Sequence, residues 1–181
     1  AYIMQEIFVG KISEQDIENF LLSLSGKGET SDELTGAVLA MRAASLKVDL
    51  KEKDNLVDCC GTGGIGKSMM NVSTTAGLVS AAAKIKIAKH GNRTATGKSG
   101  SADVLEAADV NLSLSPNQVA KCIEEIGIGF MFAQNFHPGM KFIMPVRKRI
   151  ADKTIFNLLG PLTNPAGAKR QCIGVYDPKW V

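Results

Sequence analysis

Four glycines lie within six positions, directly after a short apolar stretch, in the run Asp58-Cys59-Cys60-Gly61-Thr62-Gly63-Gly64-Ile65-Gly66. Glycine tolerates positive φ and has no side chain, so successive backbone N–H groups can converge on an anion. Asn71, Ser73 and Thr74 begin the next expected helix, whose N-terminus would favour phosphate oxygens. The pattern indicates a phosphate-binding turn. A tight strand-to-helix turn without a ligand is the alternative.

A second group of polar residues follows the next expected strand. It consists of Lys89-His90-Gly91-Asn92-Arg93 and Lys98-Ser99-Gly100-Ser101. In open parallel sheets, loops at the carboxyl ends of neighbouring strands line one crevice, so these cations should lie beside the glycine-rich turn. A solvated surface loop would explain the charge, but not a helix start at Ser101 aimed at the same region. We therefore favour an anion site.

The string Gly61 to Ser68 also matches the formal pattern of a Walker A loop, GxxxxGKS. A nucleotide hydrolase should in addition supply a Walker B aspartate after an apolar strand. No convincing aspartate of this kind stands in the sequence, so a nucleotide hydrolase ranks second.

Two kinds of sequence must position these residues. The first part has apolar residues at helical spacing, as in Ile17, Phe20, Leu21 and Leu24, and predicts helices that begin after Ser13 and Thr30. From residue 56 on, short apolar runs alternate with helical segments, which is typical of a parallel sheet with crossover helices. Expected strands are 56–60, 85–88, 129–132 and 171–175, and a helix is expected over 140–150 despite its proline.

Composition limits the partners. Apolar residues make up 45% of the 181-residue chain and its net charge is +3, so a packed core is expected and a global basic field for nucleic acid is not. The four cysteines lack the spacing of a zinc site and suggest thiols in a reducing cytoplasm. Neither a basic leader at the start nor an apolar run of membrane-spanning length is seen, so we expect neither secretion nor a membrane partner.

Five blocks occur in an order that resembles one enzyme family. They are Gly61 to Gly64, Asn71 to Thr74, Lys89 to Arg93, Ser99 to Glu106 and Asn157 to Pro165. Together they resemble anthranilate phosphoribosyltransferases, over the whole chain but about the first half of a family member. The resemblance implies transfer of the 5-phosphoribosyl group of phosphoribosyl diphosphate to the amine of anthranilate, with release of diphosphate, in tryptophan biosynthesis.

The resemblance also implies a fold and a division into domains. The expected fold is α/β, with a small helical domain and a mainly parallel sheet with crossover helices, of the nucleoside phosphorylase/phosphoribosyltransferase type. The helical domain should span 1–54, and 137–163 should return to it. Residues 55–136 should form the α/β domain that binds phosphoribosyl diphosphate, and 164–181 should begin the rest of it, the chain being a truncated fragment. A homodimer through the helical domain is expected.

Site residues follow from the same resemblance. Lys89 and Arg93 are the expected catalytic cations, because departure of diphosphate needs stabilised negative charge. Ser73 is the expected ligand of a Mg²⁺ cofactor. Arg147 is expected near anthranilate, although a solvated helix face is its alternative; His90 is expected near the aromatic ring or as a bonded loop residue. The expected substrate-binding residues are Gly61, Thr62, Gly63, Gly64, Asn71, Ser73, Thr74, Lys89, His90, Gly91, Asn92, Arg93, Lys98, Ser101 and Arg147.

Two positions depart from the family pattern. Ile65 stands where an aspartate is usual, and Met69 where a small hydroxyl residue is usual. Loss of a carboxylate removes a possible metal or ribose contact, so metal use or affinity should differ. The family's acidic magnesium-binding pair would lie beyond Val181.

Two other functions fit parts of the pattern. A pyrimidine nucleoside phosphorylase would share the architecture and the glycine-rich anion loop, but the blocks at Lys89 and Ser99 fit the transferase better. A non-catalytic paralogue that binds phosphorylated ligands or nucleic acid is the other alternative. The modest charge weighs against nucleic acid as a partner.

Overall fold

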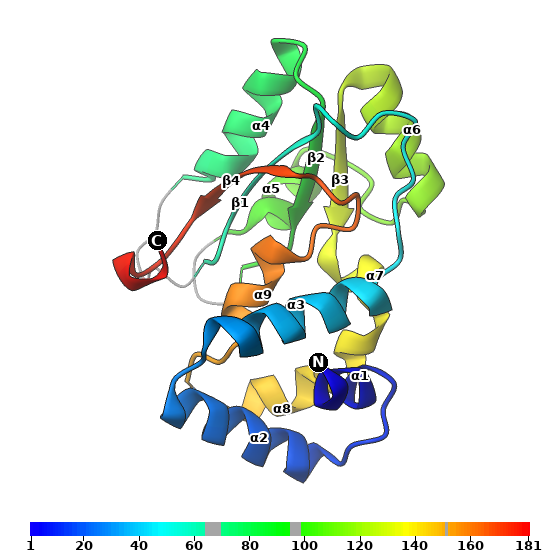
Figure 1. Cartoon of the computed structure of the whole chain (residues 1–181). Helices are drawn as coiled ribbons and strands as arrows, with labels where there is room; N and C mark the ends of the chain where they lie inside the picture. The colour runs from blue at the N-terminus through cyan, green and yellow to red at the C-terminus, as the bar shows by residue number, and fades with distance from the viewer. Residues whose placement is uncertain (64–69, 95–98, 151) are drawn as a thin grey trace. The chain divides into compact units, whose positions relative to one another are not determined.

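The computed structural model describes residues 1–63, 70–94, 99–150 and 152–181 (Figure 1). The chain divides into two units. The helical unit comprises Ala1–Leu46 and His137–Thr163, and the α/β unit comprises Lys47–Phe136 and Asn164–Val181. Each unit is therefore completed by a segment that returns late in the sequence.

Residues 47–54, grouped with the helical domain in the sequence-based division, fall in the α/β unit. Val48 is fully buried in the core of that unit. Its N–H donates to the carbonyl oxygen of Pro165 at 3.2 Å. Leu50 also packs against this core, so apolar side chains and a backbone bond hold this otherwise charged stretch in the α/β unit.

The helical unit is built from short helices. In chain order these are α1 (Tyr2–Phe8), α2 (Glu14–Lys27), α3 (Ser31–Ala44), η1 (Pro138–Phe142), α8 (Met144–Arg149) and α9 (Phe156–Leu162). The predicted starts after Ser13 and Thr30 are confirmed. Ser13 accepts a hydrogen bond from the Asp16 N–H, and Thr30 forms a reciprocal capping box with Glu33. These side chains satisfy N–H groups that the first helical turn leaves unpaired.

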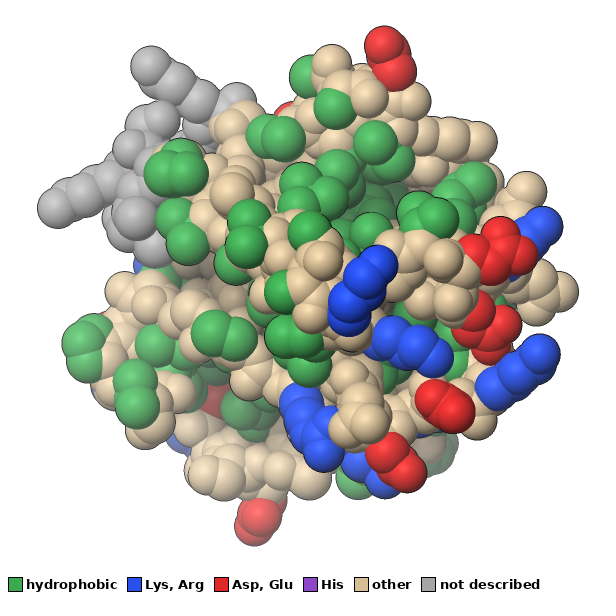
Figure 2. Space-filling model, turned by 90° about the horizontal axis from the view of Figure 1, so that it is seen from above, with side chains coloured by type: hydrophobic (Ala, Val, Ile, Leu, Met, Phe, Trp, Pro, Cys, Tyr) green, Lys and Arg blue, Asp and Glu red, His purple; other side chains and the backbone are tan. Residues whose placement is uncertain are grey.

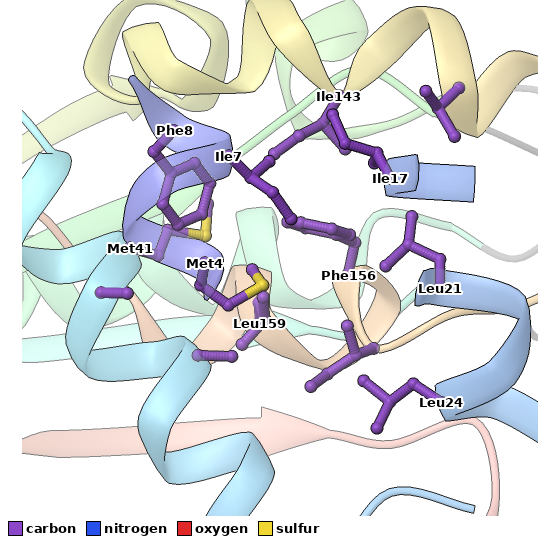
Figure 3. Close-up of a cluster of buried hydrophobic side chains, with 14 residues drawn as sticks. Met4, Ile7, Phe8, Ile17, Leu21, Leu24, Met41, Ile143, Phe156 and Leu159 are labelled. Carbon is purple, nitrogen blue, oxygen red and sulfur yellow. The ribbon is translucent and has the colours of Figure 1, made fainter. Parts of the chain in front are cut away.

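The two segments of the helical unit share one core (Figure 3). Ile7 and Ile17 from the first segment are fully buried together with Ile143 and Leu159 from the second. The rings of Phe8 and Phe156 meet edge to face with centroids 6.3 Å apart. Apolar burial of this kind is the main favourable term in folding, so each segment needs the other to remove its apolar face from water.

The expected continuous helix over 140–150 is divided. The chain forms the 3₁₀ helix η1, and the α-helix α8 starts only at Met144. Pro145 lies in the first turn of α8. Proline fits a first turn, where no N–H is needed, but in a helix interior it removes a backbone bond and clashes with the preceding turn.

The α/β unit contains the predicted parallel sheet. Its described strands are β1 (Val57–Gly61), β2 (Ile87–Gly91), β3 (Ile128–Phe132) and β4 (Arg170–Gly174). Their order is β3-β2-β1-β4, and each neighbouring pair is parallel. The helices of this unit are α4 (Val72–Ala82), α5 (Ser101–Ala107), α6 (Pro116–Ile126), α7 (Ala133–Phe136) and η2 (Pro178–Trp180).

The two faces of this sheet carry different helices. A Cβ on Gly77 of α4 would meet Ile87 and Lys89, so these β2 residues point toward α4. A Cβ on Gly129 of β3 would meet Ile123 and Val119 of α6, which marks the other face. Figure 1 shows α4 and α6 flanking the strands. Crossover helices on both faces are the expected companions of a parallel sheet.

The surface shows both polar and apolar regions. On the face drawn in Figure 2, hydrophobic side chains occupy the middle, while Lys and Arg mix with Asp and Glu along one side. The charged side chains on this face are therefore of both signs. Within the described ranges, no helix combines the length and the apolar character needed to cross a bilayer.

Candidate functional site

The glycine turn begins at the carboxyl end of β1 and is anchored to β4. The Thr62 N–H donates to the carbonyl oxygen of Gly174 at 2.9 Å. In return, Thr62 Oγ1 accepts a bond from the Tyr176 N–H at 3.1 Å. Gly63 has φ +66°, in the left-handed region that favours glycine. Gly64 and most of the Walker-like string lie outside the described residues.

Two sequence blocks that are far apart meet at the start of α4. The Asn71 side-chain amide donates to Ser99 Oγ at 2.9 Å, and Thr74 Oγ1 donates to Ser101 Oγ at 3.0 Å. The segment Asn71–Thr74 and the segment Ser99–Ser101 are therefore neighbours, as the position of both loops at the carboxyl ends of the strands predicts. This arrangement places two hydroxyl-bearing segments at the N-terminus of an 11-residue helix, whose dipole favours anions.

Lys89 is the buried cation of the site. Only 2% of its surface is exposed. Its Nζ donates to the carbonyl oxygen of Cys59 at 2.6 Å and to Ser73 Oγ at 3.3 Å. Burial lowers the pKa of Lys89, because desolvation disfavours the charged form, and the nearby Asp58 carboxylate opposes this effect. A partly satisfied cation beside a helix N-terminus is well placed to attract an anion.

Asp58 and Asn164 bond to each other and to the backbone of β2, the strand that carries Lys89. Asp58 is fully buried and accepts bonds from the His90 N–H at 3.2 Å and from the Asn164 amide at 2.8 Å. The same amide donates to the carbonyl oxygen of Ala88 at 2.9 Å. Sequence reasoning missed both residues. An aspartate inside an apolar strand was the available signal for Asp58, and Asn164 lies in the last of the five blocks.

Arg93 is paired with carboxylates. Its guanidinium donates to both oxygens of Glu106, at 2.5 and 2.7 Å, and to Asp103 at 3.3 Å. It also lies 5.6 Å from the centroid of the Phe132 ring. The bonds to Glu106 raise the pKa of Arg93 and lower that of Glu106. Arg93 thus joins the Lys89–Arg93 block to α5, and Lys98 is outside the described ranges.

Asp103 and two glycines shape the loop around Arg93. Asp103 Oδ2 accepts bonds from the N–H groups of Thr94 and Gly100, at 3.0 and 2.6 Å. These bonds lower the pKa of Asp103. A Cβ on Gly100 would lie 2.5 Å from the Thr94 nitrogen, and one on Gly91 would lie 2.9 Å from the Phe130 ring. The glycines therefore allow a close backbone approach that a side chain would prevent.

Asn92 contributes polar groups to the same loop. Its side-chain oxygen accepts bonds from the Arg93 N–H at 2.8 Å and from the Gln134 amide at 3.5 Å. Its carbonyl oxygen accepts a bond from the Ala102 N–H at 3.3 Å, at the start of α5. Asn92 therefore links the end of β2 to the helix that follows it.

Arg147 lies on α8 in the helical unit. It is half-buried, whereas the adjacent Lys148 and Arg149 are exposed. Its guanidinium lies 5.7 Å from the centroid of the Phe156 ring, and burial lowers its pKa. Arg149 instead pairs with Glu14 and Glu18. The environment of Arg147 differs from that of a fully solvated helix cation.

Comparison with known proteins identifies the family. Residues 53–181 match the α/β domain of a glycosyl transferase family, and residues 1–45 match the helical bundle domain of a glycosyl transferase family. The chain belongs to this glycosyl transferase family. The family's two-part architecture agrees with the helical and α/β units of the chain.

Two similar relatives carry the same name. The chain is 54% identical over 175 residues to the anthranilate phosphoribosyltransferase of Methylobacillus flagellatus, and 52% identical over 179 residues to that of a Marinomonas species. These alignments cover 97% and 99% of the chain but 51% of each relative. The chain therefore spans about half the length of these curated relatives. The resemblance predicted from the five blocks is confirmed.

Solved structures agree with the same family. The anthranilate phosphoribosyltransferase from Thermus thermophilus has a TM-score of 0.94 and 45% identity, over 99% of the chain and 54% of that structure. The Saccharomyces cerevisiae enzyme in complex with PRPP and Mg has a TM-score of 0.86 and 27% identity, over 98% of the chain and 52% of that structure. The predicted α/β fold class is confirmed.

The donor atoms of the site suit a magnesium ion only in part. Among the described residues no group of three or more His, Cys, Asp or Glu is arranged to hold a metal. Ser73 Oγ is a hard oxygen of the kind that Mg²⁺ accepts, and Mg²⁺ usually keeps waters and substrate phosphates in its shell. Asp103 and Glu106 are already bonded to Arg93. Ser73 Oγ could therefore supply one ligand to a magnesium ion whose other ligands are phosphate and water oxygens.

Proposed function

We propose that this chain carries the phosphoribosyl diphosphate site of an anthranilate phosphoribosyltransferase. The reaction would join the amine of anthranilate to C1 of the ribosyl 5-phosphate and release diphosphate. The observation that carries the proposal is Lys89, a buried lysine that meets a helix N-terminus at the carboxyl ends of β1 and β2. Support also comes from the relatives named anthranilate phosphoribosyltransferase.

Charge stabilisation is the main task of such a site. An aromatic amine is already nucleophilic, whereas departure of diphosphate leaves negative charge that needs fixed positive groups. The Lys89 ammonium would take part of that charge. The N–H groups of the turn at Gly61, Thr62 and Gly63 and the hydroxyls of Ser73 and Thr74 would bind the phosphate oxygens. No nucleophilic side chain is required.

Arg93 would act in a different way from Lys89. Its guanidinium is bonded to Glu106 and Asp103, so contact with diphosphate would require at least one of these bonds to open. We propose that it contributes by holding Asn92 and the Ser99–Ser101 segment in position, and that its catalytic role runs through this loop. His90 and Gly91 would also help to hold this segment in position.

Magnesium and anthranilate complete the proposal. A bound Mg²⁺ would supply positive charge to the diphosphate, with Ser73 Oγ as its ligand from this chain. Gly61, Asn92 and Arg147 would contact anthranilate, and Lys98 and Gly64 would belong to the diphosphate site. The Saccharomyces cerevisiae enzyme has been solved with 4-fluoroanthranilate, at a TM-score of 0.78 and 26% identity, which supports a substrate of this class.

A homodimer through the helical unit is also proposed. Three apolar side chains, Tyr2, Ile3 and Leu39, are 72%, 48% and 59% exposed on α1 and α3. Burial of such side chains against a second copy would remove them from water. Sedimentation of the wild-type chain and of a Leu39→Glu variant tests this. We expect the variant to shift toward monomer, and equal sedimentation of both chains as dimers would contradict this interface. A cytoplasmic location is proposed, with the described cysteines as free thiols.

The decisive experiment separates binding from catalysis. Phosphoribosyl diphosphate is titrated into the protein with and without Mg²⁺ by calorimetry, and anthranilate fluorescence is then followed. We expect saturable binding that Mg²⁺ strengthens, followed by a loss of anthranilate fluorescence as product forms. The proposal would be overturned if the protein bound neither phosphoribosyl diphosphate nor inorganic diphosphate. Consumption of a pyrimidine nucleoside with phosphate instead would favour the phosphorylase.

A further inference from the structure

Two cysteines face each other across neighbouring strands of the α/β unit. Cys59 of β1 and Cys172 of β4 are register partners in a parallel pair. Parallel strands lie about 4.8 Å apart, and register partners project from the same face of the sheet. Disulfides join Cα atoms that are about 4.4–6.8 Å apart, so this spacing lies within the range.

The two thiols lie on the α4 face, apart from the third cysteine of these strands. Side chains alternate along β1, where Asp58 and Cys60 are buried and Cys59 is half-buried. Lys89 points toward α4, and Val57 is the register partner of Ile87, so Cys59 shares the α4 face with Lys89. Cys60 points to the opposite face. The pair therefore involves Cys59 and Cys172, without Cys60.

The two members of the pair differ in exposure. Cys172 is exposed and Cys59 is half-buried, and both are free thiols. Burial raises the pKa of the Cys59 thiol, and the neighbouring Cys172 thiol raises it further. This influence agrees with the register in placing the two sulfur atoms near each other. An accessible thiol beside a shielded one is the arrangement in which one sulfur attacks a disulfide and the other resolves it.

We propose that Cys59 and Cys172 form a redox-active dithiol, which a low-molecular-weight disulfide such as oxidised glutathione converts to an inter-strand disulfide. Cys172, as thiolate, attacks one sulfur of oxidised glutathione and releases one glutathione thiolate. Cys59 then loses its proton and attacks the sulfur of Cys172 in the mixed disulfide, which releases the second glutathione. Two protein thiols are oxidised and one glutathione disulfide is reduced to two glutathione molecules.

The new bond would lie directly beneath the glycine turn. Cys59 is two residues before Gly61, and Cys172 is two residues before Gly174. Gly174 already accepts the Thr62 N–H, and the β1–β4 register continues past the cysteines to Gly61 and Gly174, so hydrogen bonds join the two segments there. A disulfide would add a covalent link below them. Oxidation would thus stiffen the base of the turn without using any residue of the proposed diphosphate site.

The test measures which cysteines become linked. The 181-residue chain is incubated with oxidised glutathione, alkylated and analysed by intact mass and by tryptic mapping without reduction. We expect a mass loss of about 2 Da before alkylation, as two thiol hydrogens leave, and two fewer alkylated thiols than in the untreated chain afterwards. Tryptic mapping should show a linked pair of peptides, 54–67 with 171–179. The variants Cys60→Ser and Cys122→Ser should keep the link, while Cys59→Ser should lose it and keep glutathione on Cys172.

Two results would overturn the dithiol. One is stable glutathionylation of Cys172 in the wild type with no linked peptide. The other is the same link in Cys59→Ser, which would assign it to Cys60. Circular dichroism of each variant shows whether the sheet is retained, and Cys172→Ser provides a second variant that should lose the link in a folded chain.

Discussion

The Nζ atom of Lys89 lies 2.6 Å from the carbonyl oxygen of Cys59, the residue two positions before the glycine turn. A side chain of β2 thereby bonds to the backbone of β1. The same Nζ reaches Ser73 Oγ in α4. The Lys89 ammonium thus bonds to the segment before residues 64–69 and to the segment after them. These two bonds fix its position at the carboxyl end of β1.

Replacement of Lys89 by methionine should abolish most of the affinity for phosphoribosyl diphosphate. A hydrogen bond to a charged group contributes about 1.5–3 kcal/mol, so we expect affinity to fall about 10–100-fold. Calorimetric titration with Mg²⁺ measures this. The matched control is Lys121→Met, because Lys121 is an exposed lysine on α6. Equal affinity in Lys89→Met and wild type would remove Lys89 from the site.

Gly100→Ala should weaken ligand binding and stability together. The new Cβ would lie 2.5 Å from the Thr94 nitrogen and 2.8 Å from the Asn92 carbonyl oxygen, and backbone atoms cannot move aside cheaply. Gly26→Ala in α2 is the control, because a Cβ there meets nothing within 4 Å. It should stabilise the chain by about 0.5–1 kcal/mol. Urea denaturation measures both effects, and equal midpoints would contradict the close approach.

Asp103→Ala should lower the stability of the chain more than Glu106→Ala does, although each variant removes one carboxylate partner of Arg93. Asp103 also accepts hydrogen bonds from the backbone N–H groups of Thr94 and Gly100. Its loss would leave both N–H groups without this acceptor. We expect a loss of about 1–3 kcal/mol for Asp103→Ala and a smaller one for the exposed Glu106 pair. Urea midpoints and hydrogen exchange at the Thr94 amide report the difference. The reverse order would contradict the role of Asp103.

Acid should weaken the start of α3. A hydrogen bond from Lys27, with bonds from Thr30, lowers the pKa of Glu33 from 4.5 to about 2. A carboxylate with a lowered folded-state pKa adds stability above its unfolded pKa and loses it as the pH falls through the folded value. The advantage of wild type over Glu33→Gln in urea midpoint should therefore be greatest near neutral pH and fade between pH 4.5 and 2. Asp32→Asn is the control, and a pH-independent gap would contradict the assignment.

Local signals predicted much of the fold. Ser13 and Thr30 mark helix starts because a side-chain oxygen caps the first turn, and this requires only neighbouring residues. The parallel sheet follows from the alternation of apolar runs and helices. The break near Pro145 was missed, because the helical spacing of the apolar residues continues past a proline whose local effect depends on where a helix begins.

The sequence predicted which segments meet at the candidate site better than which side chains bond to each other there. Asn71, Thr74, Ser99 and Ser101 meet as the carboxyl-end rule for parallel strands requires. The pairing of Arg93 with Glu106 could not be read from spacing, since they are thirteen positions apart and lie in different elements. The Asp58–Asn164 bond spans 106 positions, so it depends on the order of the strands.

The interleaved composition of the two units has a consequence for how the chain is made. During synthesis, Met4, Ile7 and Phe8 leave the ribosome long before Ile143, Phe156 and Leu159, which complete their core. Most of the α/β unit is translated in between. Nascent chains start folding from the N-terminus, and apolar surface exposed in the interval promotes aggregation. The first 46 residues should therefore be the segment that chaperones of nascent chains protect during translation.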